Sequence, residues 1–370
     1  MATFNPRGYR KQSWPLQILE INSIARITKL SDEDAPRISV VILNFNGMRH
    51  LKRCLESVLN TEYPNFEVIF VDNASVDGSL NLVKRNFGGK QNIRIVQNEK
   101  NYGFAEGNNI GAKKADGHYL VFLNNDTEVK VNWLKELVKA SGPPGIGVVQ
   151  SMSLWIRDRR TIDSFGGFID AFGYSHNLAD FASRSNEIFY AEGLCLFISK
   201  ELFDKIGGFD GDYFFFEEDV DLCWRVHLQG LKVVVAPESI VYHARGGTAP
   251  GKLMKLEPNW ARLTARNRLI TLVKNYGLVN AFRYVPPTIL LEIGKAFWLI
   301  LIRKPRIGLA TLQGILEVLV HLRHIWAKRV VVQSHVRRVS DSAVMKIVIP
   351  AKESVHRLLG YSTLLRKEAD

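Results

Sequence analysis

Short runs of consecutive apolar residues alternate with stretches of helical periodicity in the first part of the chain, and this alternation limits the possible folds more than any other feature. The apolar runs cover residues 38–44, 66–72, 93–98 and 119–124. Runs of this length and composition are typical of strands that are buried on both faces. Helical spacing follows them at residues 49–60, 79–87, 105–114 and 132–140. Repeated strand–helix units predict an α/β fold with a mostly parallel sheet flanked by helices.

Charge divides the chain into parts with different chemistry. Residues 37–250 carry 23 Lys and Arg against 26 Asp and Glu, whereas residues 251–370 carry 21 against 7. We therefore predict a lead-in over 1–36, an enzyme-like α/β domain over 37–250 and a basic α-helical extension over 251–370. The 3 cysteines are too few and too widely spaced for a disulfide framework or a Cys-rich zinc module.

The basic extension has features of helices that contact membranes. Residues 285–302 are the best candidate for a membrane span, but Glu292 and Lys295 lie in its middle. Each would cost about 2.5–3.5 kcal/mol at the bilayer centre. Residues 312–326 are predicted to form one amphipathic helix. We favour peripheral contact with an anionic membrane, at its inner, cytoplasmic face. The alternative is a helical domain for packing or homo-oligomer formation. Binding to nucleic acid is disfavoured, because no nucleic-acid-binding fold is evident.

Polar side chains come directly after three of the predicted strands. Asn44, Asp72 and Asn124 close the runs ISVVILN, FEVIFVD and YLVFLN. In open parallel sheets, ligands bind beyond the carboxyl ends of the strands, near the point where the strand order reverses. A single Asp or Asn at a strand end is common, because both residues favour turns. The same placement after successive strands predicts a ligand site. The sequence has no G-x-G-x-x-G turn and no Walker lysine loop, which disfavours a dehydrogenase and a P-loop NTPase.

Longer motifs carry a family resemblance. The chain contains, in order, the runs ISVVILNFNG, VIFVDNASVDGS and NEKNYGFAEGNNIGAKKADGHYLVFLNNDTEV. They resemble the donor-binding half of family 2 glycosyltransferases of the GT-A fold. The later run AEGLCLFISKELFDKIGGFDGDYFFFEEDVDLCWR resembles their acceptor half, in the branch that includes rhamnosyl- and galactofuranosyltransferases. The resemblance covers about residues 37–250; beyond them it is limited to the outline around Arg266-Asn267-Arg268-Leu269.

The resemblance implies a nucleotide-sugar donor site. Asp72 would bind the uracil or thymine edge of the nucleotide, and Asn44 and Asn46 would line the same pocket. Asn109, at the start of the third helix, would help to hold the nucleotide.

The resemblance also implies a metal. Asn124-Asn125-Asp126 occupies the place of the family's Asp-x-Asp motif, so Asn125 would lie at the donor and Asp126 would ligate Mg²⁺ or Mn²⁺ at its two phosphates. Asn124 replaces the first Asp of the motif, which leaves the metal fewer anionic ligands. His243 matches a position that is a further metal ligand in some relatives; a locally hydrogen-bonded histidine is the equally weighted alternative.

The acidic cluster Glu217-Glu218-Asp219-Val220-Asp221 holds the candidate general base. Matched to the family, Asp219 would deprotonate the acceptor hydroxyl, which implies inversion at the anomeric carbon. Glu218 would contact the acceptor, and Asp221 would pair with Arg225. Without the resemblance, the same acids could simply cap a helix on a solvated face.

The predicted function is therefore a metal-dependent, inverting glycosyltransferase that moves a sugar from a UDP- or dTDP-sugar to a lipid-linked or polysaccharide acceptor. A sugar nucleotidyltransferase is an alternative, but it would need a cationic loop after the first strand, where the sequence reads NFNG. A catalytically silent scaffold that binds nucleotide-sugar or membrane is a second alternative, against which the intact Asp72, Asp126 and Asp219 argue.

Overall fold

The computed structural model of the chain describes residues 35–176, 186–245 and 257–353. The described residues from Pro36 onward belong to one compact unit. The predicted lead-in over 1–36 and the predicted boundary near residue 250 fall almost wholly outside the described residues, so both stay predictions.

The predicted strand–helix units are present. The strands are β1 (Ile38–Asn44), β2 (Phe66–Asp72), β3 (Ile93–Gln97) and β4 (Tyr119–Asn124). The helices are α1 (Met48–Leu59), α2 (Ser79–Phe87), α3 (Gly103–Ala112) and α4 (Trp133–Ser141). In α1, the buried residues Leu51, Cys54, Leu55 and Val58 recur every three or four positions. One helical face therefore covers the sheet, as the periodicity predicts.

A ten-stranded sheet runs through this unit in the order β10-β12-β6-β11-β4-β1-β2-β3, with β5 paired to β12 and β7 to β6. Its later strands are β5 (Thr127–Val129), β6 (Ile146–Trp155), β7 (Ile162–Ser164), β10 (Glu187–Ile188), β11 (Cys195–Ser199) and β12 (Lys232–His243). Strands β4, β1, β2 and β3 run parallel, whereas β11 lies antiparallel between β4 and β6. A separate pair is formed by β8 (Phe168–Ile169) and β9 (Ser175–His176). The predicted α/β fold with a central, mostly parallel sheet is confirmed.

The strand order reverses between β1 and β4. The chain proceeds from β1 through β2 to β3, and then places β4 on the other side of β1. The register pairs Asn44 with Asp72 and Leu43 with Asn124. The carboxyl ends of three strands therefore meet at one edge of the sheet, which is where ligands bind in open α/β sheets.

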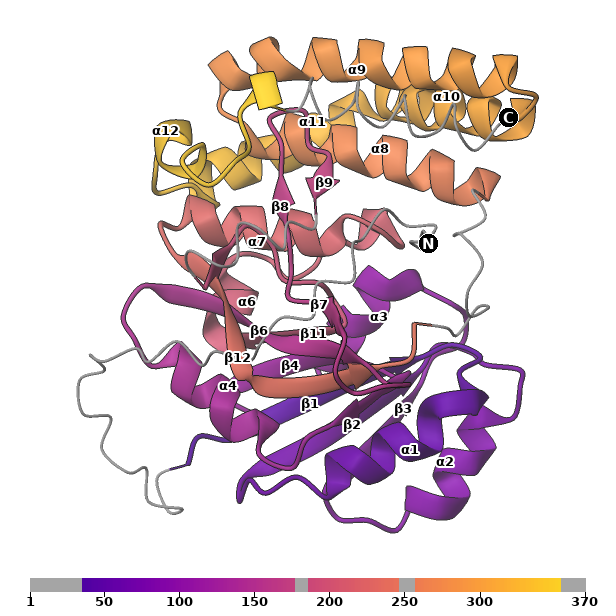
Figure 1. Cartoon of the computed structure of the whole chain (residues 1–370), viewed down its shortest axis with the longest axis vertical. Coiled ribbons are helices and arrows are strands. Elements are labelled where there is room, and N and C mark those ends of the chain that lie inside the picture. The colour runs from indigo at the N-terminus through magenta and orange to yellow at the C-terminus, as the bar shows by residue number, and fades with distance from the viewer. Residues whose placement is uncertain (1–34, 177–185, 246–256, 354–370) are drawn as a thin grey trace, which may run out of the picture. The chain divides into compact units, whose positions relative to one another are not determined.

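Helices cover both faces of the sheet and form a further layer. Figure 1 shows α1, α2 and α4 on one side of the sheet, and α3, α6 and α7 on the other, with the C-terminal helices beyond α7. The later helices are α6 (Lys200–Lys205), α7 (Glu218–Leu228), α8 (Pro258–Asn275), α9 (Leu278–Leu301), α10 (Pro305–Val320), α11 (Leu322–Val331) and α12 (Asp341–Val344). Gly211–Tyr213 form a 3₁₀ turn and Val332–Val336 a π-helical turn. The predicted helical C-terminal region is therefore present.

The C-terminal helices differ from prediction in one respect. The single helix expected over 312–326 is instead the end of α10 and the start of α11, because His321 between them leaves the helical conformation (φ −97°, ψ 15°). The candidate span over 285–302 belongs to α9, which begins earlier, at Leu278. Among the described residues, α9 is the helix that is long and apolar enough to cross a membrane.

Candidate active site

Asn44 is the centre of the polar network where the strand order reverses. Its buried side-chain amide donates hydrogen bonds to Asp72 Oδ1 (3.3 Å) and Ser75 Oγ (3.0 Å). Its own Oδ1 accepts a hydrogen bond from Nδ2 of Asn125 (2.7 Å). The network joins the ends of β1, β2 and β4, so the strand-end residues singled out in the sequence lie together.

The turn after β1 is shaped around this network. Asn46 has a positive φ of 52°, and its Oδ1 accepts a hydrogen bond from the Val76 amide (2.9 Å). A Cβ atom on Gly47 would lie only 2.4 Å from Asn44 Oδ1 and 2.1 Å from Asn125 Nδ2. Only glycine lets the Asn125–Asn44 hydrogen bond cross this turn, which explains the glycine of the NFNG run.

Asn109 has a different position from the other predicted donor residues. Its Nδ2 donates to the Phe209 carbonyl (2.8 Å), and its Oδ1 accepts from the Phe209 amide (3.0 Å). Both ends of the side chain therefore hold the turn that leads to the acidic cluster. Asn109 thus has a role in positioning this turn, and its predicted contact with a nucleotide stays a prediction.

His243 lies between two carboxylates at the end of β12. Its Nε2 is 3.3 Å from Asp126 Oδ1, and its Nδ1 is 2.9 Å from Asp163 Oδ2. Burial alone would lower the pKa of His243, but the two carboxylates outweigh it and raise the pKa to about 9. The side chain of Asp163 is itself buried and is paired with Arg245. The pKa of Asp163 is lowered, because His243 and Arg245 together overcome the effect of burial.

The residues around His243 suit a divalent cation bound with a diphosphate. A carboxylate on Nδ1 fixes the ring orientation and leaves Nε2 to act as a ligand, the usual arrangement around metal-binding histidines. Asp126 supplies a carboxylate oxygen on the same side as Nε2. No group of three or more His, Cys, Asp or Glu that could hold a metal occurs among the described residues. Most of the ligands would therefore come from phosphate oxygens and water.

Asp219 lies in the first turn of α7 and is partly exposed. Its Oδ2 accepts a hydrogen bond from the Gly193 amide (3.1 Å), and its Oδ1 accepts one from the Val220 amide (2.8 Å). Burial and the nearby Glu192 raise the pKa of Asp219 to about 6, although the backbone donors oppose this shift. A carboxylate with such a pKa is suited to take up a proton near neutral pH.

The segment Glu192–Leu194 connects the two halves of the site. The Gly193 amide binds Asp219, and the Leu194 carbonyl accepts a hydrogen bond from the Asn124 amide (3.0 Å). The carboxylate of Asp219 is thus held beside the turn that carries Asp126. Burial raises the pKa of Glu192, which interacts with both Asp219 and His243.

The other acids of the cluster have distinct environments. Glu218 is buried, its Oε2 has no hydrogen-bond partner among the described residues, and burial raises its pKa well above the usual value. Glu217 lies 3.4 Å from Arg268, and burial raises its pKa to about 7. Asp221 is fully buried and accepts two hydrogen bonds from the Arg225 guanidinium (3.0 and 2.8 Å). The predicted pairing of Asp221 with Arg225 is confirmed.

A buried asparagine from the C-terminal part supports the loop before Asp219. Phe214, Phe216 and Glu217 all have positive φ values, of 62°, 71° and 68°. Asn267 Nδ2 lies 3.0 Å from the carbonyl oxygens of Tyr213 and Phe215, and 2.8 Å from that of Phe216. The C-terminal helices therefore help to build the active site, which the charge division of the sequence does not reveal.

Sequence reasoning missed three residues of this site: Asp163, Glu192 and Asn267. Asp163 comes from a region of weak periodicity, and only the fold brings it to His243. Glu192 had a signal, because it is the second residue of the run AEGLCLFISKELFDKIGGFDGDYFFFEEDVDLCWR that carries the resemblance. Asn267 had a signal, because it lies within the Arg266-Asn267-Arg268-Leu269 outline of the resemblance.

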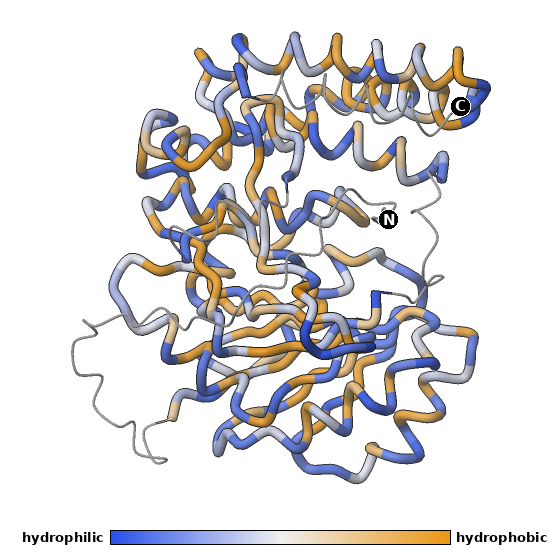
Figure 2. The backbone as a smooth tube through the Cα atoms, viewed as in Figure 1, coloured by the Kyte–Doolittle hydropathy of each residue, from blue (hydrophilic) through white to orange (hydrophobic). Residues whose placement is uncertain are grey.

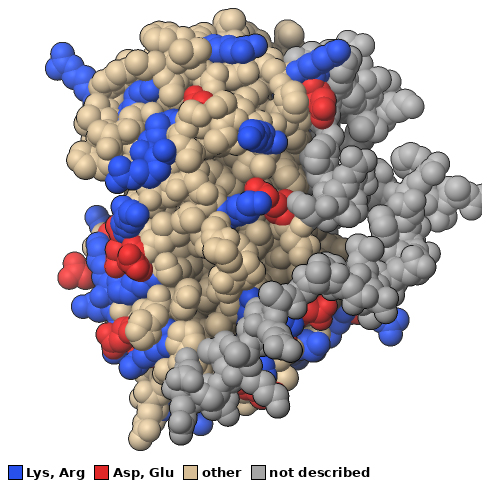
Figure 3. All heavy atoms as spheres, turned by 90° about the vertical axis from the view of Figure 1, so that its left-hand side faces the viewer, with Lys and Arg blue, Asp and Glu red and all other residues tan. Residues whose placement is uncertain are grey.

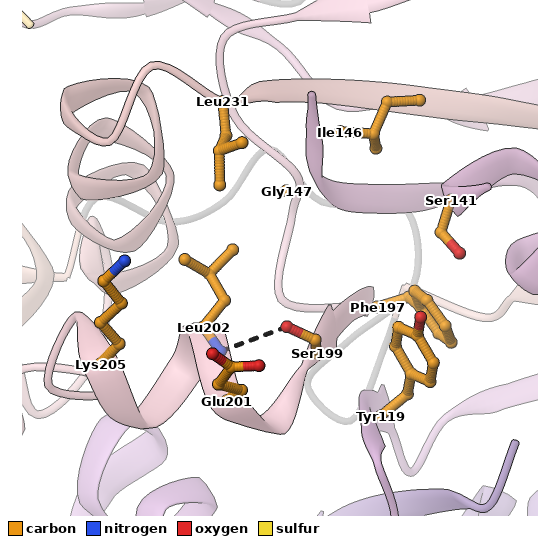
Figure 4. Close-up of a pocket in the computed structure, with 10 residues that line it drawn as sticks. All are labelled: Tyr119, Ser141, Ile146, Gly147, Phe197, Ser199, Glu201, Leu202, Lys205 and Leu231. Atoms are coloured by element: carbon orange, nitrogen blue, oxygen red, sulfur yellow. Dashed lines mark hydrogen bonds between the residues drawn. The ribbon is translucent and has the colours of Figure 1, made fainter. Parts of the chain in front are cut away.

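A pocket of about 290 Å³ lies elsewhere, at the opposite edge of the sheet. Tyr119, the first residue of β4, lines it, whereas Asn124 at the other end of that strand lies at the candidate site. Figure 4 shows Glu201, Leu202 and Lys205 of α6 around this pocket, with the Leu202 amide bonded to Ser199 Oγ. Two of its lining residues are charged, and nothing about them resembles the carboxylate and imidazole cluster described above.

Comparison with known proteins agrees with the geometry. The Glycosyl transferase family 2 profile matches residues 39–207. The chain is 26% identical over 227 residues to the O-antigen biosynthesis protein RfbC of Myxococcus xanthus, covering 56% of this chain and 17% of that protein. It is 29% identical over 132 residues to the poly(ribitol-phosphate) beta-N-acetylglucosaminyltransferase TarS of Staphylococcus aureus, covering 31% and 23%. The chain therefore spans a quarter or less of these curated relatives.

Solved structures share the fold. The structure of S. aureus TarS 1–349 with UDP-GlcNAc has a TM-score of 0.52 at 17% identity, covering 80% of this chain and 91% of that one. GalNAc-T7 with UDP, GalNAc and Mn²⁺ has a TM-score of 0.52 at 21% identity, covering 65% and 48%. Residues 39–207 therefore match the Glycosyl transferase family 2 profile, and the solved structures share the fold of this chain.

Proposed function

We propose that this protein is a metal-dependent, inverting glycosyltransferase that transfers a hexosyl group from a UDP- or dTDP-sugar. One observation carries the proposal: Gly193 and Leu194 tie Asp219 to the Asn124–Asp126 turn. A general base with a raised pKa and a candidate diphosphate site are thereby held together in a family 2 domain. The resemblance in the sequence supports the rhamnosyl or galactofuranosyl branch as the donor class.

The donor half of the mechanism uses the edge of the parallel strands. Asp72 would accept a hydrogen bond from the uracil or thymine ring, and Asn44 holds Asp72 in place. Asp126 and His243 would hold Mg²⁺ or Mn²⁺. When bound, this cation neutralises the charge that develops on the departing nucleoside diphosphate.

The acceptor half uses the acidic cluster. Asp219 takes the proton of the acceptor hydroxyl as its oxygen bonds to the anomeric carbon, while the bond from that carbon to the diphosphate breaks. Because the nucleophile enters opposite the leaving group, the configuration inverts. Glu218, whose pKa burial raises well above its usual value, would contact the acceptor.

The names of relatives support a cell-surface acceptor. RfbC is named for O-antigen biosynthesis, and TarS for transfer to poly(ribitol-phosphate). Both names refer to polymers and not to small metabolites. We therefore propose a polysaccharide or lipid-linked saccharide hydroxyl as the acceptor.

Donor binding and turnover test this function separately. UDP, dTDP, GDP and CDP are added to the full chain with and without Mn²⁺ or Mg²⁺, and melting is recorded. A ligand at 100 times its dissociation constant stabilises the fold by about 2.7 kcal/mol. We expect a metal-dependent rise in melting temperature for UDP or dTDP. Equal or absent shifts for all four nucleotides would refute the donor assignment.

Asp219→Asn tests the base. We expect slow hydrolysis of the donor, with water in place of the acceptor, to fall by about 10²–10⁴-fold while metal-dependent UDP binding persists. Glu201→Gln, at the pocket on the opposite edge of the sheet, is the matched control and should leave both unchanged. Full activity of Asp219→Asn would refute the assignment of Asp219 as the general base. Release of pyrophosphate from UTP and a sugar 1-phosphate would favour the nucleotidyltransferase alternative.

A further inference from the structure

Helices α9, α10 and α11 turn large apolar side chains outward. On α9, the exposed fractions are 77% for Phe282, 68% for Leu290 and 80% for Leu301. The neighbouring helices also expose Leu319, at 56%, and Trp326, at 49%. Figure 2 shows the hydrophobic stretches of α9 at the outer limit of the molecule, away from the sheet. A soluble helix normally buries such a face.

The polar faces of the same helices are the ones that pack inward. Glu317 of α10 pairs with Arg262 of α8 (2.8 Å). Lys328 of α11 pairs with Asp212 (2.5 Å), in the turn before the acidic cluster. Glu292 of α9 is fully buried and ion-paired. These contacts fix the helices in an orientation that leaves their apolar faces to the outside.

The outward surface is also positively charged. The two acidic residues of α9–α11, Glu292 and Glu317, are both ion-paired within the protein. Arg303, Lys304 and Arg306, at the turn between α9 and α10, are exposed and have no ion pair within the part of the chain that the structure describes. On the face that Figure 3 draws, the upper part over the C-terminal helices shows Lys and Arg between large uncharged areas, with little acidic surface. An anionic surface is the complementary partner.

We propose that α9–α11 dock the protein on an anionic lipid bilayer, with α9 lying in the interface. A helix of 24 residues is about 36 Å long. Its apolar stripe beside cationic side chains has the pattern of interfacial helices. The buried face of α9 stays within the protein, because Glu292 is ion-paired to Arg268 and would be unpaired in a helix that left the domain to span the bilayer. This docking does not depend on the proposed sugar transfer.

Vesicle binding tests the proposal. The full chain is sedimented with phosphatidylcholine vesicles that contain either no anionic lipid or about one third phosphatidylglycerol, at 0.1 M salt. We expect binding to the anionic vesicles and weak binding to the neutral ones. In Arg303→Gln/Lys304→Gln/Arg306→Gln, affinity should fall about 100-fold, since each basic residue contributes about fivefold near an anionic leaflet. The matched control is Lys84→Gln/Arg85→Gln/Lys90→Gln, on and after α2. It should bind the anionic vesicles as strongly as the unmodified protein does.

The apolar variant separates lipid from a protein partner. Phe282→Ser/Leu290→Ser/Phe297→Ser changes only exposed side chains, so its melting temperature without vesicles should be unchanged. Its affinity for anionic vesicles should fall by roughly tenfold for each side chain. If the unmodified protein did not bind vesicles but formed a dimer that this variant converts to a monomer, the apolar face would bind a second copy of the chain. That result would overturn the proposal. Protein that resists extraction by 1 M salt and alkaline pH would overturn interfacial docking in favour of a span.

Discussion

Asn267→Ala removes a single buried side chain that supports three backbone carbonyls of the loop before Asp219. Asn267 is fully buried on α8, and its amide nitrogen serves the carbonyl groups of Tyr213, Phe215 and Phe216. The loop is strained, because three of its non-glycine residues have positive φ angles. We expect the substitution to release this strain by moving the loop, and with it the carboxylate of Asp219.

The magnitudes of support and strain are comparable. Each neutral hydrogen bond contributes about 1 kcal/mol net, so loss of the Asn267 amide costs roughly 2–3 kcal/mol. Each residue held in a left-handed conformation costs about 1–2 kcal/mol, which over three residues is enough to drive relaxation once the support is gone. With an unfolding entropy of about 2.1 cal/mol/K per residue over roughly 330 residues, this loss corresponds to a fall in melting temperature of at most about 3–4 °C, because relief of the backbone strain offsets part of it. A shift of about 1 Å in the base lowers turnover by about 100-fold.

The assay compares melting, UDP binding and donor hydrolysis in two variants. Asn275→Ala is the matched control, because Asn275 is equally buried on the same helix and bonds the structural carboxylate of Asp221 (2.8 Å). We expect both variants to melt a few degrees lower and to bind UDP normally, while only Asn267→Ala loses about 100-fold in turnover. If Asn267→Ala melted lower but turned over at the rate of Asn275→Ala, the positioning role would be wrong.

Two further predictions follow from the same geometry. His243 must lose its proton to ligate a metal, and the pKa of about 9 keeps it protonated at neutral pH. Mn²⁺ affinity in the presence of UDP, measured by calorimetry, should therefore rise about tenfold per pH unit from pH 7 to 8.5; a flat profile, or the same slope in His243→Gln, would contradict ligation by His243. Gly103→Ala would place a Cβ 2.4 Å from the Phe214 carbonyl oxygen, at a residue whose φ is +79°. The melting temperature of this variant should therefore fall by about 3 °C or more. Gly89 has open space around it, so Gly89→Ala should melt like the unmodified protein. If both glycine variants melted at the same temperature, the Phe214 backbone would have to move away from the added Cβ at little cost in stability.

The sequence is sufficient to predict the parallel half of the sheet because local signals and tertiary environment agree there. The run at 38–44 is a strand from Ile38 to Asn44, and the helical spacing after it becomes α1 with its apolar residues buried. Periodicity is much weaker over 141–190, where the observed strands are mostly two or three residues long. Strands of that length have no pattern of their own and depend on their neighbours for pairing. That region holds Asp163, which sequence reasoning therefore could not place beside His243.

Predictability of the site divides along the same line. Asn44, Asp72 and Asp126 follow strands whose register brings them together, so their placement at one edge needs little beyond the strand assignment. Asn109 shows the limit of this reasoning, because its helix is correct while its side chain holds Phe209. A motif position fixes the backbone near a ligand, but long-range contacts decide which way the side chain turns.

The C-terminal helices show why net charge is a poor guide to surface chemistry. The excess of Lys and Arg after residue 250 suggests one basic surface, yet Lys274 is almost fully buried between Asp210 (2.6 Å) and Asp221 (2.9 Å). Arg268 likewise lies between Glu217 of the acidic cluster and Glu292 of α9. Lys274 and Arg268 thus neutralise carboxylates in the interior, where an unpaired charge would be costly. Arg303, Lys304 and Arg306, by contrast, lie exposed together at the turn between α9 and α10. The same helices therefore supply both the support of the acidic loop and the surface proposed to meet the membrane.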